Sequence, residues 1–190
     1  LKSGVSWWYN WYYTTTAPSN YFDDYQMEFI PMLWGGNTSN SDITAVKSFI
    51  LNHPEVKYLL VMNEPNLTDQ ANRTPEQAAV DWLKYEQVVS DLAAQQRTVY
   101  LVGPAMTWGT MPNYSDPVVW LDAFYAAYKN ANGNRPPKID YLAFHWYDYG
   151  LAGQLDRLQK YGKQIWVTEM ANWNSQINSY QKQAAQMVEM

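Results

Sequence analysis

The fold is decided by residues 57–66, KYLLVMNEPN. The apolar run from Tyr58 to Met62 has the length and composition of a strand that is buried on both faces, as strands of parallel sheets are. Pro65 has no N–H to donate to a sheet and keeps Glu64 out of the helical conformation, so the strand must end there. Glu64 is therefore expected at the carboxyl end of a core strand, where parallel α/β folds place their chemistry.

A second stretch, residues 164–170 with the sequence QIWVTEM, has the same form and also ends near a glutamate, Glu169. The segment between the two glutamates has the length of three βα units of about 35 residues each. In a parallel barrel, strands three units apart face each other across the mouth, and two carboxylates held there suit glycoside hydrolysis. Either glutamate alone would be interpreted as a solvated strand end, but the matched pair indicates catalysis.

The composition favours a single domain and argues against polyanionic partners. At 190 residues, the chain is long enough for one domain, residues 1–190, with a sizeable core. Its 10 Trp and 16 Tyr exceed what a core needs, and aromatic rings suit stacking against sugars as well as packing. With a net charge of −5 and no basic run, the sequence argues against nucleic acid and anionic membranes as partners.

The sequence offers few metal ligands. It contains no Cys and only two His, His53 and His145, which excludes disulfides, thiolate sites and a His-rich zinc centre. We therefore expect no metal and no cofactor. No apolar segment approaches transmembrane length, and we expect no signal peptide within these 190 residues.

Strands and helices are expected to alternate along the chain. Apolar and aromatic runs predict strands that begin near residues 4, 28, 58, 98, 139 and 164, the second of them running through Pro31. Helices are predicted between them, the first capped by Ser41 or Asp42 and the last beginning near Ser175. The clearest start signal is TPEQ at residues 74–77, a capping box with Pro at the first helical position. This alternation predicts a parallel α/β fold with right-handed crossovers.

Five motifs span nearly the whole chain: WWYNW at residues 7–11, FIPMLWG at 29–35, NEP at 63–65, FHWY at 144–147 and WVTE at 166–169. In this order they resemble glycoside hydrolase family 128, the fungal and bacterial endo-β-1,3-glucanases built on a (β/α)8 barrel of the clan A type. In clan A enzymes, the Asn-Glu pair closes the fourth strand and the second glutamate closes the seventh.

The resemblance implies a TIM-type (β/α) barrel that is shortened. If Glu64 closes the fourth strand and Glu169 the seventh, the sequence supplies strands two to seven and lacks sequence for the first and eighth strands. A typical barrel of this kind needs about 250 residues. The absent strands would be neighbours, so one wall would be open, and its unpaired edges favour self-association.

The resemblance also implies roles for individual residues. Glu64 would be the general acid/base and Glu169 the nucleophile of a retaining mechanism, with Asn63 hydrogen-bonded to the 2-hydroxyl of the sugar. His145 or Tyr147 would donate to Glu169 and keep it ionised; the alternative for His145 is a structural role. The residues expected to bind substrate beside Asn63 are Asn10, Trp11, Trp34, Trp108, His145, Trp146, Tyr147 and Trp173, with core or loop packing as the alternative for each aromatic residue.

The function implied by the resemblance is retaining endo-β-1,3-glucanase activity on laminarin-like or curdlan-like polymers or their oligosaccharides. Two alternatives stay open at this point: a non-catalytic β-glucan-binding protein on a degenerate barrel, and a clan A glycosidase that acts on another β-linked polysaccharide. An extracellular, secreted location is inferred from the polymeric substrate.

Overall fold

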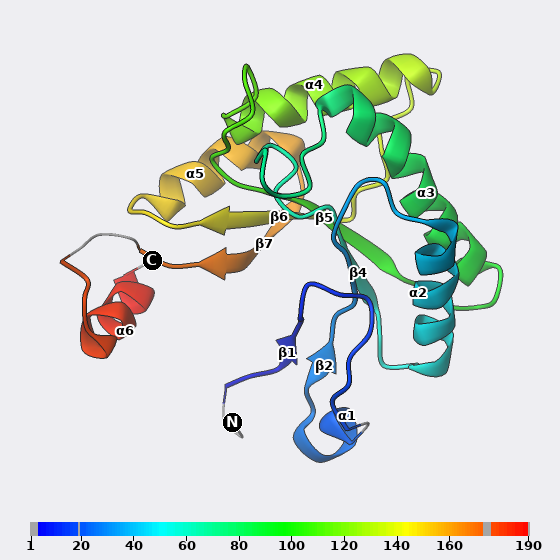
Figure 1. Ribbon diagram of the computed structural model, residues 1–190, viewed down its shortest axis with the longest axis horizontal. Coiled ribbons are helices and arrows are strands. Elements are labelled where there is room, and N and C mark those ends of the chain that lie inside the picture. Colours follow the sequence, from blue (N-terminus) through cyan, green and yellow to red (C-terminus); the bar gives the residue numbers. More distant parts are fainter. Residues whose placement is uncertain (1–3, 19, 173–175, 190) are drawn as a thin grey trace.

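The computed structural model describes residues 4–18, 20–172 and 176–189 as a parallel α/β fold (Figure 1). The strands are β1 (Trp7–Trp8), β2 (Glu28–Phe29), β3 (Met32–Leu33), β4 (Tyr58–Val61), β5 (Tyr100–Met106), β6 (Tyr141–Trp146) and β7 (Gln164–Met170). The helices are α1 (Tyr21–Tyr25), α2 (Asn40–Asn52), α3 (Pro75–Ala93), α4 (Pro117–Ala131), α5 (Leu151–Leu158) and α6 (Tyr180–Glu189), with a 3-10 turn at Gln159–Tyr161. The predicted alternation is confirmed, although α1 has no counterpart among the predicted helices.

The strands form two parallel sheets that share one chain segment. β3, β4, β5, β6 and β7 lie side by side in that order, and β1 pairs with β2. The prediction of a single strand through Pro31 is wrong, because this residue has no N–H for a ladder and the strand divides around it into β2 and β3. The two halves pair with different neighbours, β1 and β4, so residues 28–33 join the two sheets.

Helices α2 to α5 cover the outer side of the five-stranded sheet (Figure 1). These helices bury aromatic residues that lie three or four positions apart: Trp82 and Tyr85 on α3, and Trp120 and Phe124 on α4, have no exposed surface. These large rings pack with the outward-facing side chains of the strands in one continuous core. The outer core therefore fixes the central strands firmly.

The helix starts follow their capping signals. The capping box at Thr74 is confirmed, since its hydroxyl accepts from Gln77 N–H at 3.3 Å and the Gln77 side chain accepts from Thr74 N–H at 3.1 Å. The first predicted helix begins slightly earlier than expected, because Ser39 is its N-cap in place of Ser41 or Asp42. Ser39 has the same short hydroxyl chemistry, so the sequence identified the kind of cap and missed its position.

The inner face of the sheets carries a second core. Its buried members come from β3, β4, β5, β6 and the segment before β3: Ile30, Met32, Leu60, Val102, Ala105 and Ala143. Near the amino ends of the strands, the Trp166 ring lies 4.8 Å from that of Tyr58 and 5.3 Å from that of Trp7, measured between centroids. Trp7 lies on β1 and Trp166 on β7, so the two-stranded sheet and the far edge of the five-stranded sheet meet through side chains.

The parallel α/β part of the prediction is confirmed, since the strands are parallel and helices lie on the outer side of the sheet, whereas the barrel itself stays a prediction. In the described ranges, no backbone pairing joins β1 to β7. α6 lies apart from the other helices (Figure 1). It begins at Tyr180, and the predicted start near Ser175 lies outside the described residues. No helix in the described part of the chain is long and apolar enough to span a membrane.

Candidate active site

The two glutamates meet at the carboxyl ends of the strands. Glu64, just after β4, is buried, whereas Glu169, on β7, is partly buried. His145, on β6, lies between them, with its Nδ1 2.8 Å from Glu64 Oε1 and 3.7 Å from Glu169 Oε2. A carboxylate oxygen of Glu64 lies within 4.8 Å of one of Glu169. β4 and β7 are not neighbours in the sheet, so the curvature of the sheet brings these carboxylates together.

The backbone around Glu64 departs from a regular strand. Met62 and Glu64 have φ angles of 61° and 44°, a left-handed conformation that costs energy in residues other than Gly. Successive side chains of a regular strand point to opposite faces, but Asn63 and Glu64 line the same cavity. Their N–H groups are fixed by neighbouring segments, since Asn63 donates to Trp34 O and Glu64 to Ala105 O, each at 2.8 Å.

Three side chains donate to Glu169. Tyr9 Oη and Trp11 Nε1 donate to its Oε1 at 2.8 and 2.7 Å, and the Tyr147 hydroxyl donates to its Oε2. Burial favours the neutral carboxyl, but His145 and the three donors outweigh this effect and hold the pKa of Glu169 below its ordinary value. Burial, together with the bond to Glu169, raises the pKa of Tyr9 and of Tyr147. The tyrosines therefore stay protonated as donors, and Glu169 stays ionised.

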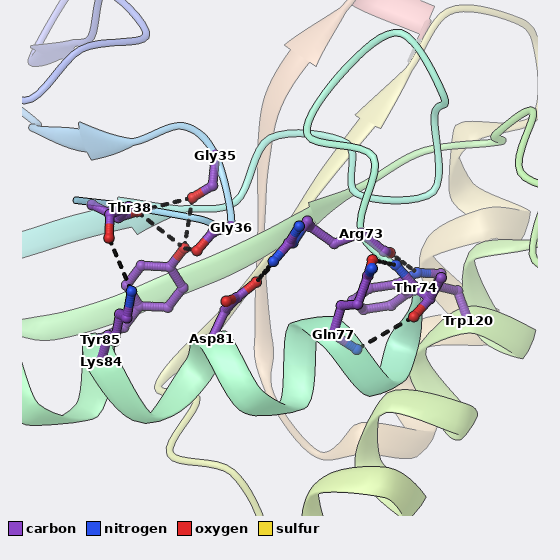
Figure 2. A network of polar contacts seen from close by, with 10 residues as sticks. All are labelled: Gly35, Gly36, Thr38, Arg73, Thr74, Gln77, Asp81, Lys84, Tyr85 and Trp120. Atoms are coloured by element: carbon purple, nitrogen blue, oxygen red, sulfur yellow. Dashed lines mark hydrogen bonds and ion pairs between the residues drawn. The ribbon is translucent and has the colours of Figure 1, made fainter.

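Helix α3 holds the loop that follows β3 (Figure 2). Tyr85 Oη donates to Gly35 O at 2.6 Å, and Lys84 Nζ donates to Thr38 O at 3.1 Å. Tyr85 is fully buried, and its hydroxyl also lies 3.3 Å from Gly36 O and 3.5 Å from Thr38 Oγ1, so its partners all come from this loop. These contacts fix the position of Trp34, the residue before Gly35.

The loop that follows β4 is held by Arg73 (Figure 2). Arg73 Nε donates to Asp81 Oδ2 at 2.7 Å, and its backbone carbonyl accepts from Trp120 Nε1 at 2.9 Å. Burial raises the pKa of Asp81, although the Arg73 guanidinium opposes this effect. A Cβ on Gly36 would lie 2.5 Å from Arg73 Nε, so the ion pair packs directly against a glycine.

A cavity of about 500 Å³ opens onto the two glutamates. Its wall consists of residues from the ends of the strands and the loops above them: Trp11, Trp34, Asn63, Glu64, Leu67, Gln70, Thr107, Trp108, Tyr147 and Glu169. A second hollow shares Trp11 and Trp34 with it, and a third shares Thr107, Trp108 and Tyr147. The three hollows adjoin one another as a groove whose tryptophan rings are partly exposed.

Three other predicted site residues, His145, Trp146 and Asn10, do not line this cavity. His145 is only 1% exposed and contacts the glutamates from behind the cavity wall. Trp146 lines the third hollow. The Asn10 side chain bonds within its own loop, donating to Thr14 O at 3.0 Å. Trp173 lies outside the described residues.

Four residues of the site were not among the predicted site residues: Tyr9, which donates to Glu169, and the cavity residues Leu67, Gln70 and Thr107. Tyr9 belongs to the WWYNW motif and lies two residues after Trp7, so strand alternation offered a signal that its ring faces inward. Leu67, Gln70 and Thr107 lie in irregular loops. No periodicity marks such positions, because tertiary contacts set the path of a loop.

One group in the described part of the chain has the spacing of metal ligands. Ligand atoms of Glu64, His145 and Glu169 all lie within 4.8 Å of one another. The same atoms already interact, since His145 Nδ1 and Glu64 Oε1 are at hydrogen-bonding distance. The cluster therefore suits the sharing and transfer of protons between neighbouring side chains.

Comparisons with known proteins place the chain among carbohydrate-active enzymes. The family model described as the glycosyl hydrolase catalytic core matches residues 1–190. The crystal structure of a GH128 subgroup II endo-β-1,3-glucanase from Pseudomonas viridiflava is 52% identical to the chain, with a TM-score of 0.91, and the match covers 100% of this chain and 73% of that one. No curated protein matches the sequence.

Two more distant structures agree. A GH128 subgroup II endo-β-1,3-glucanase from Sorangium cellulosum has 28% identity and a TM-score of 0.74, covering 97% of this chain and 72% of that one. A subgroup I endo-β-1,3-glucanase from Amycolatopsis mediterranei, in complex with laminaritriose, has 27% identity and a TM-score of 0.66, covering 95% and 70%. Other oligosaccharide complexes of the Amycolatopsis enzyme carry a glutamate replaced by Ala or Gln.

Proposed function

Because the chain belongs to glycoside hydrolase family 128, we propose that it hydrolyses β-1,3-glucan as a retaining endo-glucanase. The observation that carries this proposal is that one carboxylate oxygen of Glu64 lies within 4.8 Å of one of Glu169. Retaining glycosidases hold their two carboxyl groups about 5–5.5 Å apart, whereas inverting enzymes leave about 6.5–9.5 Å for a water molecule. The spacing supports a covalent, two-step route.

In the first step, Glu169 acts as the nucleophile. Its ionised carboxylate attacks the anomeric carbon, the glycosidic C–O bond breaks, and Glu64 gives its proton to the departing sugar oxygen. The Tyr9, Trp11 and Tyr147 donors favour the ionised carboxylate before the attack. They also fix its orientation toward the cavity, which reduces the entropy lost on reaching the transition state.

In the second step, Glu64 acts as the base. It takes a proton from water, the water oxygen bonds to the anomeric carbon, and the bond between that carbon and Glu169 breaks. His145 is at hydrogen-bonding distance from Glu64 and shields it from bulk solvent, since both residues are buried. This contact keeps Glu64 aimed at the cavity through both steps.

The groove supports binding of a neutral chain of sugars. Trp11, Trp34 and Trp108 are 51%, 37% and 51% exposed, and exposed aromatic faces of this kind suit stacking against sugar rings. The two adjoining hollows share different residues with the cavity, Trp11 and Trp34 for one and Thr107, Trp108 and Tyr147 for the other. A groove longer than the central cavity suits binding of several sugar units. An extracellular location follows as a proposal from the size of β-1,3-glucan polymers.

We also infer that the strands belong to the wall of a TIM-type barrel, with β2 and β3 as two halves of one strand. The inner core shared between β1 and β7 supports this inference. In such barrels the active site lies at the carboxyl ends of the strands, which is where both glutamates lie.

The proposal is tested by hydrolysis of laminarin and linear β-1,3-gluco-oligosaccharides, with products identified by mass spectrometry and their first anomer by NMR. We expect the parent chain to release the β-anomer. Glu169→Gln should abolish turnover, and Glu64→Gln should lower kcat by about 10²- to 10⁴-fold, the range for loss of a general acid. Glu76→Gln, at an exposed position in α3, is the matched control and should have no effect.

Two results would contradict the proposal. Release of the α-anomer would mean an inverting mechanism. If the parent and both variants bound laminari-oligosaccharides equally and none cleaved them, the chain would be a glucan-binding protein and the enzyme assignment would be wrong.

A further inference from the structure

Trp108 lies where the central cavity and the third hollow meet. It follows β5, lines both hollows and is 51% exposed. The backbone on each side of it is fixed, because Asn66 Nδ2 donates to Thr107 O at 2.7 Å and a Cβ on Gly109 would lie 2.1 Å from Asn66 O. The backbone therefore sets where the ring stands in the groove, whereas the tilt of the ring depends on the side chain that packs against it.

One face of this ring is covered by Arg157, a residue of α5. The guanidinium carbon of Arg157 lies 5.7 Å from the centroid of the Trp108 ring, which is a cation–π contact. Arg157 lines neither the central cavity nor the third hollow. The two hollows therefore meet Trp108 on sides that Arg157 leaves open, and Arg157 would act on a sugar bound there through the residues that it holds.

Arg157 is itself fixed by two polar side chains. Its Nη2 donates to Asp116 Oδ2, and its Nη1 donates to Gln154 Oε1 at 2.9 Å. Asp116 caps α4, with its Oδ1 accepting from Val118 N–H at 2.9 Å. The donors of a guanidinium lie in one rigid plane, so these two bonds orient the face that Arg157 presents to Trp108.

The bond to Gln154 also decides which end of that amide faces away from Arg157. Guanidinium N–H groups can only donate, so Gln154 has to present its Oε1 to them. Its NH2 group then points elsewhere, and Gln154 belongs to the wall of the third hollow. The amide is therefore oriented to donate to an oxygen atom bound in this hollow.

The third hollow, of about 590 Å³, thus combines an aromatic ring and an amide donor that one cation holds. This combination suits a neutral sugar, which stacks its C–H face on an indole and accepts hydrogen bonds at its hydroxyl oxygens. We propose that Arg157 is a positioning residue that holds Trp108 and Gln154 in the orientation in which the third hollow binds one sugar unit of the glucan. This inference rests on the proposed glucanase function and concerns affinity for the polymer.

The test measures binding of laminarihexaose by calorimetry in the Glu169→Gln background, where the ligand is not cleaved. We expect Arg157→Met to weaken binding about fivefold, a limit set by the strength of one exposed cation–π contact. Trp108→Ala should weaken binding about tenfold. The double variant should stay within about twofold of Trp108→Ala, whereas independent effects would multiply to about fiftyfold.

Lys160→Met is the matched control. Lys160 also forms a cation–π contact, 5.3 Å from the centroid of Tyr161, and an ion pair with Asp122 at 2.7 Å, but it lines neither the central cavity nor the third hollow. The affinity for laminarihexaose should not change. With Glu169 intact, Arg157→Met should raise KM for laminarin about fivefold and leave kcat within about twofold, as the loss of uniform binding does.

Two results would overturn the inference. If Arg157→Met lowers the melting temperature and leaves the affinity unchanged, Arg157 only stabilises the fold. If Arg157→Met weakens binding as much in the Trp108→Ala background as in its absence, it does not act through the ring. The proposed function is tested separately by hydrolysis of laminarin: a parent chain that binds laminarihexaose but cleaves no glucan would contradict that function, while the affinities of the variants still decide the role of Arg157.

Discussion

The two glutamates are fixed in different ways. Glu64 follows a central strand, its backbone N–H is bound by a neighbouring strand, and every residue from Val61 to Asn66 is buried. Glu169 lies on β7, an end strand whose residues after the first are all only partly buried. Its carboxylate is oriented by the side chains of Tyr9, Trp11 and Tyr147.

Because of this difference, we expect substitutions near the two glutamates to affect stability and catalysis differently. The position of Glu64 is a consequence of the main core and of the loops that α3 anchors, so changes there alter folding and chemistry together. The position and charge of Glu169 depend on a few hydrogen bonds at the rim of the sheet. Changes there should alter the reaction while folding is preserved.

The largest effect on stability should come from the ion pair between Arg73 and Asp81, which anchors the loop after Glu64 to α3. Arg73→Met leaves Asp81, which is 6% exposed, without its cation, and we expect a loss of about 3 kcal/mol in the free energy of unfolding. The double variant Arg73→Met, Asp81→Leu also removes the unpaired carboxylate of Asp81 and should recover most of this loss. Urea titrations measure the free energy of unfolding of the single and of the double variant.

The control for that prediction is the surface pair of Lys160 and Asp122. Its atoms are also 2.7 Å apart, but both side chains are about half exposed at 49% and 50%. Lys160→Met should therefore cost less than about 1 kcal/mol. Equal losses for Arg73→Met and Lys160→Met would mean that the buried pair does not anchor the loop.

A smaller loss of stability is expected at Gly36, which packs against this ion pair, and its neighbour Gly35 is the control. An added Cβ on Gly36 would lie 2.5 Å from Arg73 Nε and 2.6 Å from Asp81 Oδ2, whereas one on Gly35 would meet nothing within 4 Å. Gly36→Ala should destabilise the protein by about 2 kcal/mol, as overpacked sites do, and Gly35→Ala by less than about 0.5 kcal/mol. Thermal unfolding of the two variants measures this difference. Similar melting temperatures for Gly36→Ala and Gly35→Ala would show that Gly36 is not closely packed against the ion pair.

The difference between the two glutamates also explains which parts of the structure are predictable from the sequence. The strand before Glu64 is predictable because Pro65 ends a continuous apolar run, and α3 because Thr74 and Gln77 make a local capping box. Each signal lies within a few residues of the element that it specifies. The structure confirms both.

Contacts between distant segments leave no such signal. Nothing near Glu169 indicates that Tyr9 and Trp11, about 160 positions earlier, donate to its carboxylate, since this depends on the curvature of the whole sheet. The division of the predicted strand around Pro31 is a related case. β2 pairs with β1 and β3 pairs with β4, and the sequence near Pro31 does not indicate these partners.

The Glu169 side provides the smallest and most selective prediction, Tyr147→Phe. This variant removes a donor to the ionised carboxylate, so the pKa of Glu169, now held below its ordinary value, should rise. The nucleophile must be ionised, and activity is lost as pH falls through this pKa. The acid limb of kcat/KM should therefore move to higher pH, with about a tenfold loss of kcat/KM on that limb.

The free energy of unfolding should change by less than about 1 kcal/mol, because Tyr147 lies at the rim of the cavity and not in the main core. Tyr149→Phe, at a half-exposed tyrosine two residues further on, is the control and should leave the pH profile unchanged. A uniform loss at every pH, or a large drop in stability with no movement of the acid limb, would show that Tyr147 supports the fold and does not set the charge of Glu169. In that case Glu169, like Glu64, would depend on residues that stabilise the fold, and the difference between the two glutamates would not hold.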